Sequence, residues 1–469
     1  MDNIKQYLEK LLQGKTVAIL GFGREGKSSY HTIRRHFPEA PLIIADRNPQ
    51  CKALFEAEYG VDSNVQFYCG NGYLEPLPQC DVILKSPGIS FKELEPNPYA
   101  GKVLSQTSIF LDLFKKQVVG VTGTKGKSTT VSLLKHIFHT AGRKVLLGGN
   151  IGVAPFELMD QVTGDTVVVF EMSSHQLENI TTSPGLSILL NIYQEHLDHY
   201  ASYRHYQLAK YNIARWQQPD DILIYNASSE VVNGLVKEFH PAGHVYAIGG
   251  DITKDNGVNC VEGNLQIRHE QKDILLSELC AHTKLPGRHN LANVMAAALA
   301  AYIKGVSSEY IAMGVESFRG LPHRLEYVGE RNGVTYYNDS ISTIPEATIE
   351  ALKSFPDTHT LLLGGFDRGV DYTLLVEYLM KHPVPCVLFI GKAGARMRDE
   401  FLKRSEDKAQ KLLWFDRFNS AVEKAFELTP SGALCLLSPA AASYDMFKNF
   451  EERGENFRQM VLEGKNTPA

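Results

Sequence analysis

The sequence contains no uninterrupted hydrophobic run close to the roughly 18 residues that would cross a membrane. Its beginning, MDNIKQYLEKLLQGK, carries too much charge for a secretory signal peptide, so we expect a cytoplasmic protein. It also lacks an excess of basic residues, because 48 Lys and Arg stand against 53 Asp and Glu and the net charge is −5. No general positive field is present to hold nucleic acid or anionic lipid, so any polyanion must be bound locally.

Cysteine is scarce. The seven cysteines are scattered along the chain and show no C-x-x-C spacing. This pattern argues against a disulfide framework and against a zinc site built from thiolates. We expect the cysteines to be free thiols that pack as small buried side chains, in a protein of a reducing compartment.

What is present is the composition of an ordinary globular protein, 43% hydrophobic and 22% charged. Runs rich in Val, Ile and Leu alternate with amphipathic stretches of helix length, which predicts an α/β protein with mainly parallel sheets. At about 150 residues per domain, the 469 residues suggest three domains. We place them at residues 1–116, 117–319 and 320–469. The segment from about residue 251 to 285 shows no clear pattern.

A glycine-rich turn, G-x-G-x-x-G at residues 21–26, lies between a predicted strand at 16–20 and a predicted helix. Asp46 ends the following strand, about 20 positions later, as in nucleotide-binding turns of Rossmann-like domains. The glycines indicate close backbone approach and a helix N-terminus that faces an anion, and they leave the nucleotide open. A second turn, at residues 86–88, follows a strand predicted at the same sheet edge.

The strongest motif is TGTKGKSTT at residues 122–130, between a strand and a predicted helix. Backbone N–H groups can surround phosphates there, Lys127 can neutralise them, and Ser128 can reach a magnesium ion. The strict G-x-x-x-x-G-K-[ST] pattern fails at one position, because Val121 stands where its first glycine belongs. The motif predicts a P-loop-type domain that binds a nucleoside triphosphate; the alternative is a glycine-rich connection without a ligand.

Three further candidates follow in the central region. Glu171 ends a predicted strand, where a carboxylate can hold magnesium opposite the phosphate loop, although a helix cap or a solvated charge is an alternative. His196 follows the next strand and is a candidate for metal or substrate binding, although an isolated histidine is usually structural. Lys210 shares a predicted helix face with Tyr206 and points toward the core, where a lysine must be paired or modified.

These motifs, in this order, resemble the Mur ligase family, the ATP-dependent amide-forming enzymes of peptidoglycan synthesis. The resemblance covers essentially the whole chain. Besides the two glycine-rich turns, it is carried by E-x-S-S-x-Q-L-E at 171–178, H-x-D at 196–198, Ala209-Lys210, G-R-H-N at 287–290, L-P-H-R at 321–324, N-D-S at 338–340 and the long stretch 437–454.

The resemblance implies a ligase that adds D-glutamate to UDP-N-acetylmuramoyl-L-alanine through an acyl phosphate and releases ADP and phosphate. It implies ATP, two magnesium ions and a Lys210 carbamoylated by carbon dioxide. We expect a Rossmann-like N-terminal domain, a P-loop-type central domain and a Rossmann-like C-terminal domain, in a monomer. We also expect the C-terminal domain to swing toward the centre when ATP binds.

The resemblance also implies roles for single residues, with Lys127, His196 and Lys210 as the catalytic ones. The ATP site would consist of Gly123, Thr124, Lys125, Gly126, Lys127, Ser128, Thr129, Asn290, Asn293, Arg324 and Asp339. The metal ligands would be Ser128, Glu171, His196 and carbamoylated Lys210. The UDP-substrate site would consist of Gly23, Arg24, Glu25, Asp46, Arg47, Ser86, Gly88 and Asn150. The D-glutamate site would consist of Thr343, Arg368, Ser443 and Phe450.

Three positions depart from the family pattern. Lys125 replaces a usual Asn in the phosphate loop and adds positive charge there. Ile341 stands where Lys is common, so a basic contact must come from elsewhere. Arg368 replaces the Lys of some members, and its guanidinium can bind a carboxylate through two hydrogen bonds.

Two other functions are open to this sequence. A folylpolyglutamate synthase-like ligase would share the central and C-terminal plan, but it would lack the N-terminal nucleotide-binding unit. A regulator without enzymatic activity would bind NAD at residues 21–26 and use Lys127 in an ATP switch. Phosphate release separates these possibilities, because a ligase needs both an acceptor and an amino acid, whereas a switch turns over without them.

Overall fold

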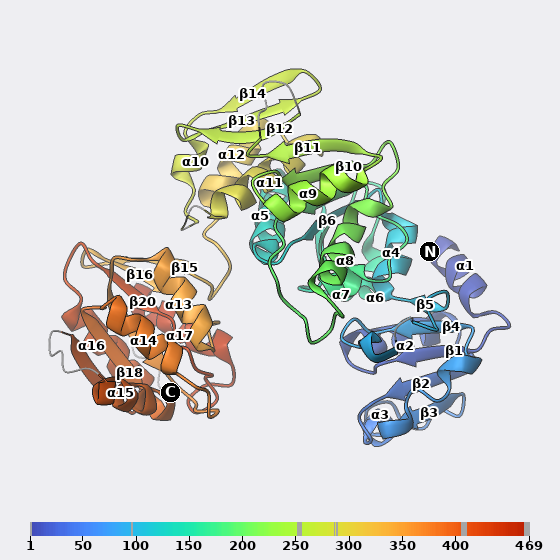
Figure 1. The fold of residues 1–469 in the computed structure, drawn as a ribbon, viewed down its shortest axis with the longest axis horizontal. Coiled ribbons are helices and arrows are strands. Elements are labelled where there is room, and N and C mark those ends of the chain that lie inside the picture. Colours follow the sequence, from blue (N-terminus) through green and yellow to red (C-terminus); the bar gives the residue numbers. More distant parts are fainter. Residues whose placement is uncertain are drawn as a thin grey trace. The chain divides into compact units, whose positions relative to one another are not determined.

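The structure is a computed structural model that describes residues 2–94, 97–250, 256–285, 287, 289–404 and 410–463. Three β-sheets with packed helices are found within these residues (Figure 1). The larger unit, residues 1–282 with 291–316, contains the first two sheets; the C-terminal unit, residues 283–290 with 317–469, contains the third. The α/β prediction is confirmed. No helix in the described part of the chain combines the length and apolar character needed to traverse a lipid bilayer.

The first sheet is entirely parallel, in the order β3-β2-β1-β4-β5. Its strands are β1 (Val17–Leu20), β2 (Leu42–Asp46), β3 (Val65–Cys69), β4 (Val82–Lys85) and β5 (Val103–Leu104). Its helices are α1 (Asp2–Leu12), α2 (Arg24–His36), α3 (Cys51–Tyr59) and α4 (Gln106–Phe114), with single 3-10 turns at Gly70–Gly72, Leu77–Gln79 and Lys92–Leu94. The order reverses at β1, so the loops after β1, β2 and β4 meet at one edge, which is where ligands bind in such sheets.

The second sheet has the order β14-β13-β12-β11-β10-β9-β6-β8-β7. Its strands are β6 (Val118–Thr122), β7 (Val145–Gly149), β8 (Val167–Glu171), β9 (Leu186–Leu189), β10 (Ile222–Asn226), β11 (His244–Ile248), β12 (Gly257–Val261), β13 (Asn264–His269) and β14 (Lys272–Leu276). Its helices are α5 (Lys127–Thr140), α6 (Pro155–Leu158), α7 (Ser174–Leu177), α8 (Tyr203–Arg215), α9 (Glu230–Phe239), α10 (Leu279–His282), α11 (His289–Ile303) and α12 (Ser308–Ser317), with a 3-10 turn at Met159–Gln161. β6 lies at the reversal point, between β8 and β9.

The segment without a clear sequence pattern forms the antiparallel meander β12–β14. In β13 only the alternate residues Leu265 and Ile267 are buried. A strand buried on one face lacks the continuous apolar run of a buried parallel strand, so the search for such runs missed it. Residues 251–255 lie outside the described part of the chain.

The third sheet has the order β15-β16-β20-β17-β18-β19 and is parallel except for the hairpin β15–β16. Its strands are β15 (Glu326–Arg331), β16 (Val334–Asn338), β17 (Thr358–Gly364), β18 (Cys386–Ile390), β19 (Lys411–Phe415) and β20 (Leu434–Leu437). Its helices are α13 (Pro345–Ser354), α14 (Thr373–Lys381), α15 (Gly391–Arg404), α16 (Phe418–Leu428) and α17 (Phe450–Glu463).

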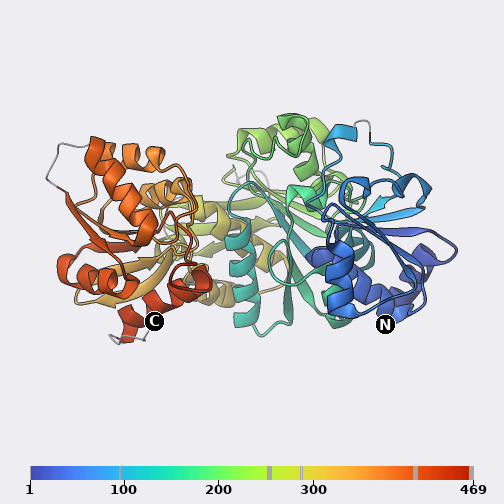
Figure 2. The same cartoon turned by 90° about the horizontal axis from the view of Figure 1, so that it is seen from below.

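Helices cover both faces of this third sheet (Figure 2). Leu361 and Leu363 of β17 pack with α13, α14 and α15, whereas Leu362 packs on the other side with α16 and α17. β20 lies at the reversal point between β16 and β17, so the loops after these three strands share one edge.

Within the larger unit, hydrogen bonds of α2 join the first sheet to the second. The buried side chain of Gln106, the first residue of α4, donates to Glu25 O (2.8 Å) and Ser29 Oγ (2.9 Å) of α2. Gln176 Nε2, from α7, donates to Glu25 Oε1 (3.1 Å), and Arg24 donates to Gly149 O (3.0 Å). The turn that precedes α2 is therefore held next to the end of β7.

Because α2 packs closely on the end of β1, we expect alanine substitutions at two nearby glycines to have different effects on stability. A Cβ at position 26 would lie 2.1 Å from Gly21 O, whereas a Cβ at position 23 would meet nothing within 4 Å. We expect Gly26→Ala to lower the free energy of unfolding by about 1–3 kcal/mol, because backbone must move. Gly23→Ala is the matched control and should change it by less than about 0.5 kcal/mol. Urea unfolding followed by circular dichroism measures both; equal stabilities would contradict this packing.

Candidate active site

The phosphate-loop motif joins β6 to α5 and turns its lysine back onto the loop. Lys127 Nζ donates to Gly123 O (2.9 Å) and Thr124 O (3.0 Å). Gly126, the N-cap of α5, has φ +87°, and a Cβ there would lie 2.4 Å from Asn293 Oδ1. The left-handed backbone therefore favours glycine, and a side chain here would displace the Asn293 amide. The structure brings the predicted ATP residues Gly126 and Asn293 together.

The same loop is held by side chains at the end of β9 and on α8. Thr124 N donates to Asn191 O and Lys125 N to Asn191 Oδ1, both at 2.8 Å. The Thr124 hydroxyl lies 3.0 Å from the Tyr206 hydroxyl. Asn191 was not predicted as a site residue; a polar residue two positions after β9, the neighbour of the reversal strand β6, is the signal that could have revealed it.

Lys210 is buried beneath the loop. α8 begins after Ser202, whose hydroxyl accepts a hydrogen bond from His205 N, and it directs Lys210 inward with only 2% of the residue exposed. Lys210 Nζ donates to Gly123 O (2.8 Å), the carbonyl that Lys127 also contacts. Burial, reinforced by the charge of Lys127, holds the pKa of Lys210 well below its usual value. This shift favours the neutral, nucleophilic form of the amine.

Glu171 ends β8 and is 1% exposed. Its Oε1 accepts a hydrogen bond from Asn150 Nδ2 (2.8 Å), while its buried Oε2 has no hydrogen-bond partner. A buried carboxylate oxygen without a donor is costly, and it fits a bound cation. In the described part of the chain, no group of three or more His, Cys, Asp or Glu residues has the arrangement to hold a metal ion alone. An ion at Glu171 would need further oxygen ligands, for which the Ser128 hydroxyl, water and substrate phosphates are candidates.

His196 lies in the loop between β9 and α8, with φ +58°. Its ring centroid is 4.9 Å from that of His175 and 5.9 Å from that of Tyr206. Burial lowers the pKa of His175 to about 4, with the neighbouring histidines adding to the effect. The preceding Glu195 pairs with Lys125 at 2.8 Å. Tyr206 thus places His196 beside the phosphate loop.

The predicted UDP-substrate residues of the first sheet gather at its reversal point. Phe22 N donates to Asp46 Oδ2 (2.6 Å) and Ser86 Oγ donates to Gly21 O (2.9 Å), so the loops after β1, β2 and β4 touch. Exposed members of the set are Gly23, Arg24, Arg47, Gly88 and Asn150. Glu25 is instead buried against α7, and burial raises its pKa.

In the C-terminal unit, Asp339 follows β16 and is 2% exposed. Its carboxylate accepts hydrogen bonds from Leu325 N (3.2 Å) and from Ser438 Oγ (2.8 Å), which follows β20. Burial raises the pKa of Asp339 to about 6. Arg324 is exposed, and its charge acts in the opposite direction on that pKa. Asn290 is buried at the start of α11, and its motif neighbour Arg288 lies outside the described residues.

The four predicted D-glutamate residues also lie on loops and elements at the edge of the third sheet. Arg368 donates to Thr343 O (3.2 Å), Ser443 is buried, and Phe450 O accepts from Ser340 Oγ (2.8 Å). Ile341, the departure from the family pattern, is exposed.

Arg453, which our sequence analysis did not single out, organises these loops. Its buried guanidinium donates to Ser340 Oγ (2.9 Å), Ser340 O (2.8 Å) and Ala441 O (3.0 Å). It therefore joins the loop after β16 to the loop after β20. The long sequence match contains both Arg453 and Ala441, but Ser340, its other partner, is 113 residues away in the chain.

Comparisons with known proteins agree with these motifs. A family model described as "Mur ligase middle domain" matches residues 121–301. The protein named "UDP-N-acetylmuramoylalanine--D-glutamate ligase" from Acetivibrio thermocellus is 31% identical over 460 residues, covering 97% of this chain and 97% of the relative. The protein of the same name from Thermoanaerobacter sp. is 32% identical over 459 residues, covering 96% and 99%.

Solved structures share the fold. Crystal structure II of MurF from Acinetobacter baumannii matches with a TM-score of 0.56 at 15% identity and covers 93% of this chain and 95% of that one. UDP-N-acetylmuramate-alanine ligase MurC from Thermotoga maritima matches with a TM-score of 0.51 at 16% identity, covering 96% and 100%. The three-domain α/β fold class is thereby confirmed.

The buried Asp339 predicts a pH dependence of stability. Its pKa rises from 3.8 to about 6 on folding, so the native state retains a proton that the unfolded chain releases. The stabilisation is complete below about pH 4 and is lost as the pH rises through about 6, a change of about 3 kcal/mol. We expect Asp339→Asn to gain about 3 kcal/mol relative to the wild type between pH 4 and pH 7.

Urea unfolding followed by the fluorescence of Trp414, in β19 of the same unit, measures this difference in a Trp216→Phe background. The exposed Asp357→Asn is the matched control and should leave the pH profile unchanged. A wild-type profile parallel to that of Asp339→Asn would show that burial does not raise this pKa.

Proposed function

The chain belongs to the Mur ligase family, and we propose that it is an ATP-dependent ligase that joins D-glutamate to UDP-N-acetylmuramoyl-L-alanine in peptidoglycan precursor synthesis. The observation that carries the proposal is the convergence of Lys127 and Lys210 on Gly123 O at the phosphate loop. A glycine-rich connection without a ligand has no need to bury a second lysine there. The relatives named for this reaction span nearly the whole chain.

The chemistry begins with activation of a poor acyl donor. The carboxylate oxygen of the alanine attacks the γ-phosphorus of ATP, the bond to ADP breaks, and an acyl phosphate forms. The amine of D-glutamate then attacks the acyl carbon, phosphate leaves, and the amine proton passes to solvent. Catalysis of phosphoryl transfer is mostly positioning and charge neutralisation. When ATP binds, Lys127 would leave the carbonyls of Gly123 and Thr124 and donate to phosphate oxygens instead. The N–H groups of the loop would orient the phosphates.

Magnesium would be held by Ser128 and Glu171 at one position and by His196 and carbamoylated Lys210 at another. The ions would supply neutralisation of the triphosphate charge. Glu171 Oε2, buried without a hydrogen-bond donor, supports the first position. Carbamoylation requires a neutral amine that attacks carbon dioxide, forms a C–N bond and releases a proton. The lowered pKa of Lys210 supports this role, because it favours the neutral form of the amine.

Substrate recognition divides among the three domains that we assign to residues 1–116, 117–319 and 320–469. The turns at 21–26 and 86–88, with Asp46, Arg47 and Asn150, would bind the UDP end. Asn290, Asn293, Arg324 and Asp339 would contact the adenosine or phosphates of ATP. Thr343, Arg368, Ser443 and Phe450 would bind D-glutamate, whose carboxylate suits a guanidinium. Because both nucleotide substrates belong to the cytoplasm, we place the reaction there.

Phosphate release tests the reaction directly. With UDP-N-acetylmuramoyl-L-alanine, ATP and magnesium, we expect release only when D-glutamate is added, with L-glutamate and L-lysine at least about tenfold slower. Lys127→Ala should slow it by about 100-fold or more. Lys135→Ala, an exposed lysine on the same helix, is the control and should be unaffected. Release without acceptor and amino acid would point to an ATP switch, and product with L-lysine alone would overturn the assigned amino acid.

The carbamate has its own test. In isotope-labelled bicarbonate, the wild type should give a carbamate carbon signal by NMR, and Lys210→Gln should not. Lys237→Gln removes an exposed lysine of the same unit and should retain the signal. Ligase activity should fall when carbon dioxide is removed and should recover when it is restored. A labelled signal that persists in Lys210→Gln would place the modification elsewhere.

A further inference from the structure

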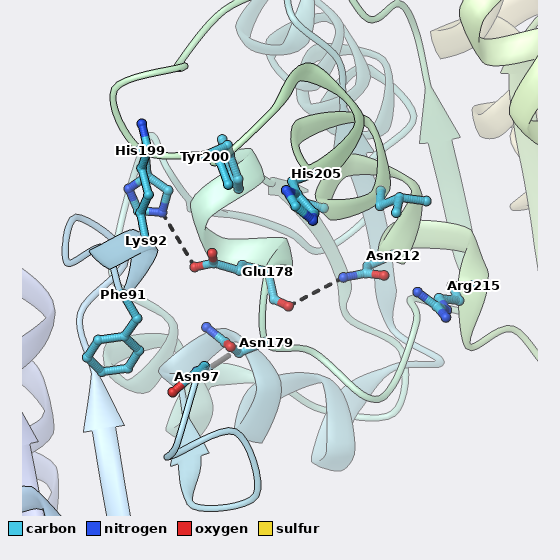
Figure 3. Close-up of a pocket in the computed structure, with 13 residues that line it drawn as sticks. Phe91, Lys92, Asn97, Glu178, Asn179, His199, Tyr200, His205, Asn212 and Arg215 are labelled. Atoms are coloured by element: carbon cyan, nitrogen blue, oxygen red, sulfur yellow. Dashed lines mark hydrogen bonds and ion pairs between the residues drawn. The ribbon is translucent and has the colours of Figure 1, made fainter. Parts of the chain in front are cut away.

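The segment after β4 in the first sheet contacts the loop that carries His196 in the second. Ser90 Oγ donates to His199 O (2.9 Å), and Lys92 Nζ donates to Leu197 O (2.7 Å). A cavity of about 250 Å³ lies against α8, and its lining includes Lys92, His199 and Glu178 (Figure 3). Neither contact involves a residue to which the proposed reaction gives a role.

Glu178 connects the same two segments through one carboxylate oxygen. Its Oε2 lies 3.5 Å from Lys85 Nζ and 3.5 Å from His199 Nε2 (Figure 3 marks the second contact). The side chain of Lys85 is 2% exposed and that of His199 is 7% exposed. A lysine so deeply buried needs a carboxylate partner. Burial alone would raise the pKa of Glu178, but the His199 contact and the Lys85 charge lower it, so the carboxylate keeps its charge.

The His199 end of this connection holds the backbone at His196. His199 N (3.1 Å) and Tyr200 N (3.0 Å) both donate to His196 O. The ring centroid of His175 lies 4.1 Å from that of His199 and 4.9 Å from that of His196. A histidine at φ +58° is retained only where its surroundings fix it. These contacts fix it.

The Lys85 end lies next to the proposed substrate turn. Lys85 is the last residue of β4, and Ser86, which follows it, donates to Gly21 O. We propose that Lys85 is a positioning residue that holds the His196 loop through Glu178 and His199, so that binding of a UDP-linked substrate at residues 86–88 orders residues 195–200. The inference rests on the proposed function, because it assumes that this turn receives the UDP-linked substrate.

Hydrogen exchange followed by mass spectrometry tests the connection without turnover. UDP-N-acetylmuramoyl-L-alanine, added without ATP or magnesium, should slow exchange in peptides covering residues 21–26 and 195–200 of the wild type, each by about threefold or more. In Lys85→Met the effect at 21–26 should persist and the effect at 195–200 should be lost. If Lys85 had only a structural role, its substitution would change the exchange rates of the free protein. It would not change the slowing of exchange that the substrate causes at 195–200.

Arg35→Met is the matched control, because the ion pair of Arg35 with Asp160 also joins the first sheet to the second, away from the His196 loop. It should retain both effects. Glu178→Gln breaks the same connection from the other side, so it reproduces the Lys85→Met result and keeps the test open if that variant fails to fold. A response at 195–200 that survives in the folded variants overturns the inference.

Two wild-type results separate the inference from its premise. Slowed exchange at 21–26 with none at 195–200 overturns the coupling and leaves the proposed function standing. No slowing at 21–26 contradicts the proposed substrate site, and the coupling falls with it.

Discussion

Gly123 O accepts hydrogen bonds from both Lys127 and Lys210, and this shared carbonyl sets the electrostatics of the candidate site. Two ammonium groups on one oxygen repel each other, and Lys210, which has no access to water, yields its proton more readily. Tyr206 supports the arrangement: its hydroxyl contacts Thr124, and its ring lies 5.0 Å beneath Lys210 Nζ. The phosphate loop is therefore built on top of a lysine whose pKa is lowered by burial and by Lys127.

The same topological rule places many of the candidate residues. In each sheet the strand order reverses at one strand, β1, β6 or β20, and the polar residues follow that strand or its neighbours. Asp46 and Ser86 follow β2 and β4, Glu171 ends β8, and Asp339 follows β16. Buried hydrophobic strands cannot carry such side chains along their length, so the side chains collect where the strands end.

This rule explains how much the sequence could predict. Continuous apolar runs located most of the parallel strands to within three residues at each end, although β3 and β5 were not predicted, and the helical spacing of Tyr206 and Lys210 correctly directed the lysine inward. The hairpin strand β15 and the meander β12–β14 were missed because antiparallel strands at a sheet border alternate polar and apolar residues. Lys85 and Arg453 were missed for another reason: each looks like an ordinary charged residue until the fold buries it, Lys85 near Glu178 and Arg453 against Ser340. The ligand roles of individual residues stay predictions.

The buried cations show how the site can be ordered before any ligand arrives. Arg453 donates to backbone carbonyls and to a hydroxyl, and desolvation lowers its pKa only to about 10, so it stays charged. Lys210 has a backbone carbonyl as its hydrogen-bond acceptor, and burial holds its pKa well below the usual value. The difference follows from their side chains, because a guanidinium starts from a higher pKa and distributes its charge over several donors. Arginine therefore suits the C-terminal loops, where a donor that stays charged joins two loops. Lysine suits the phosphate loop, where the amine must be able to lose its proton in order to react.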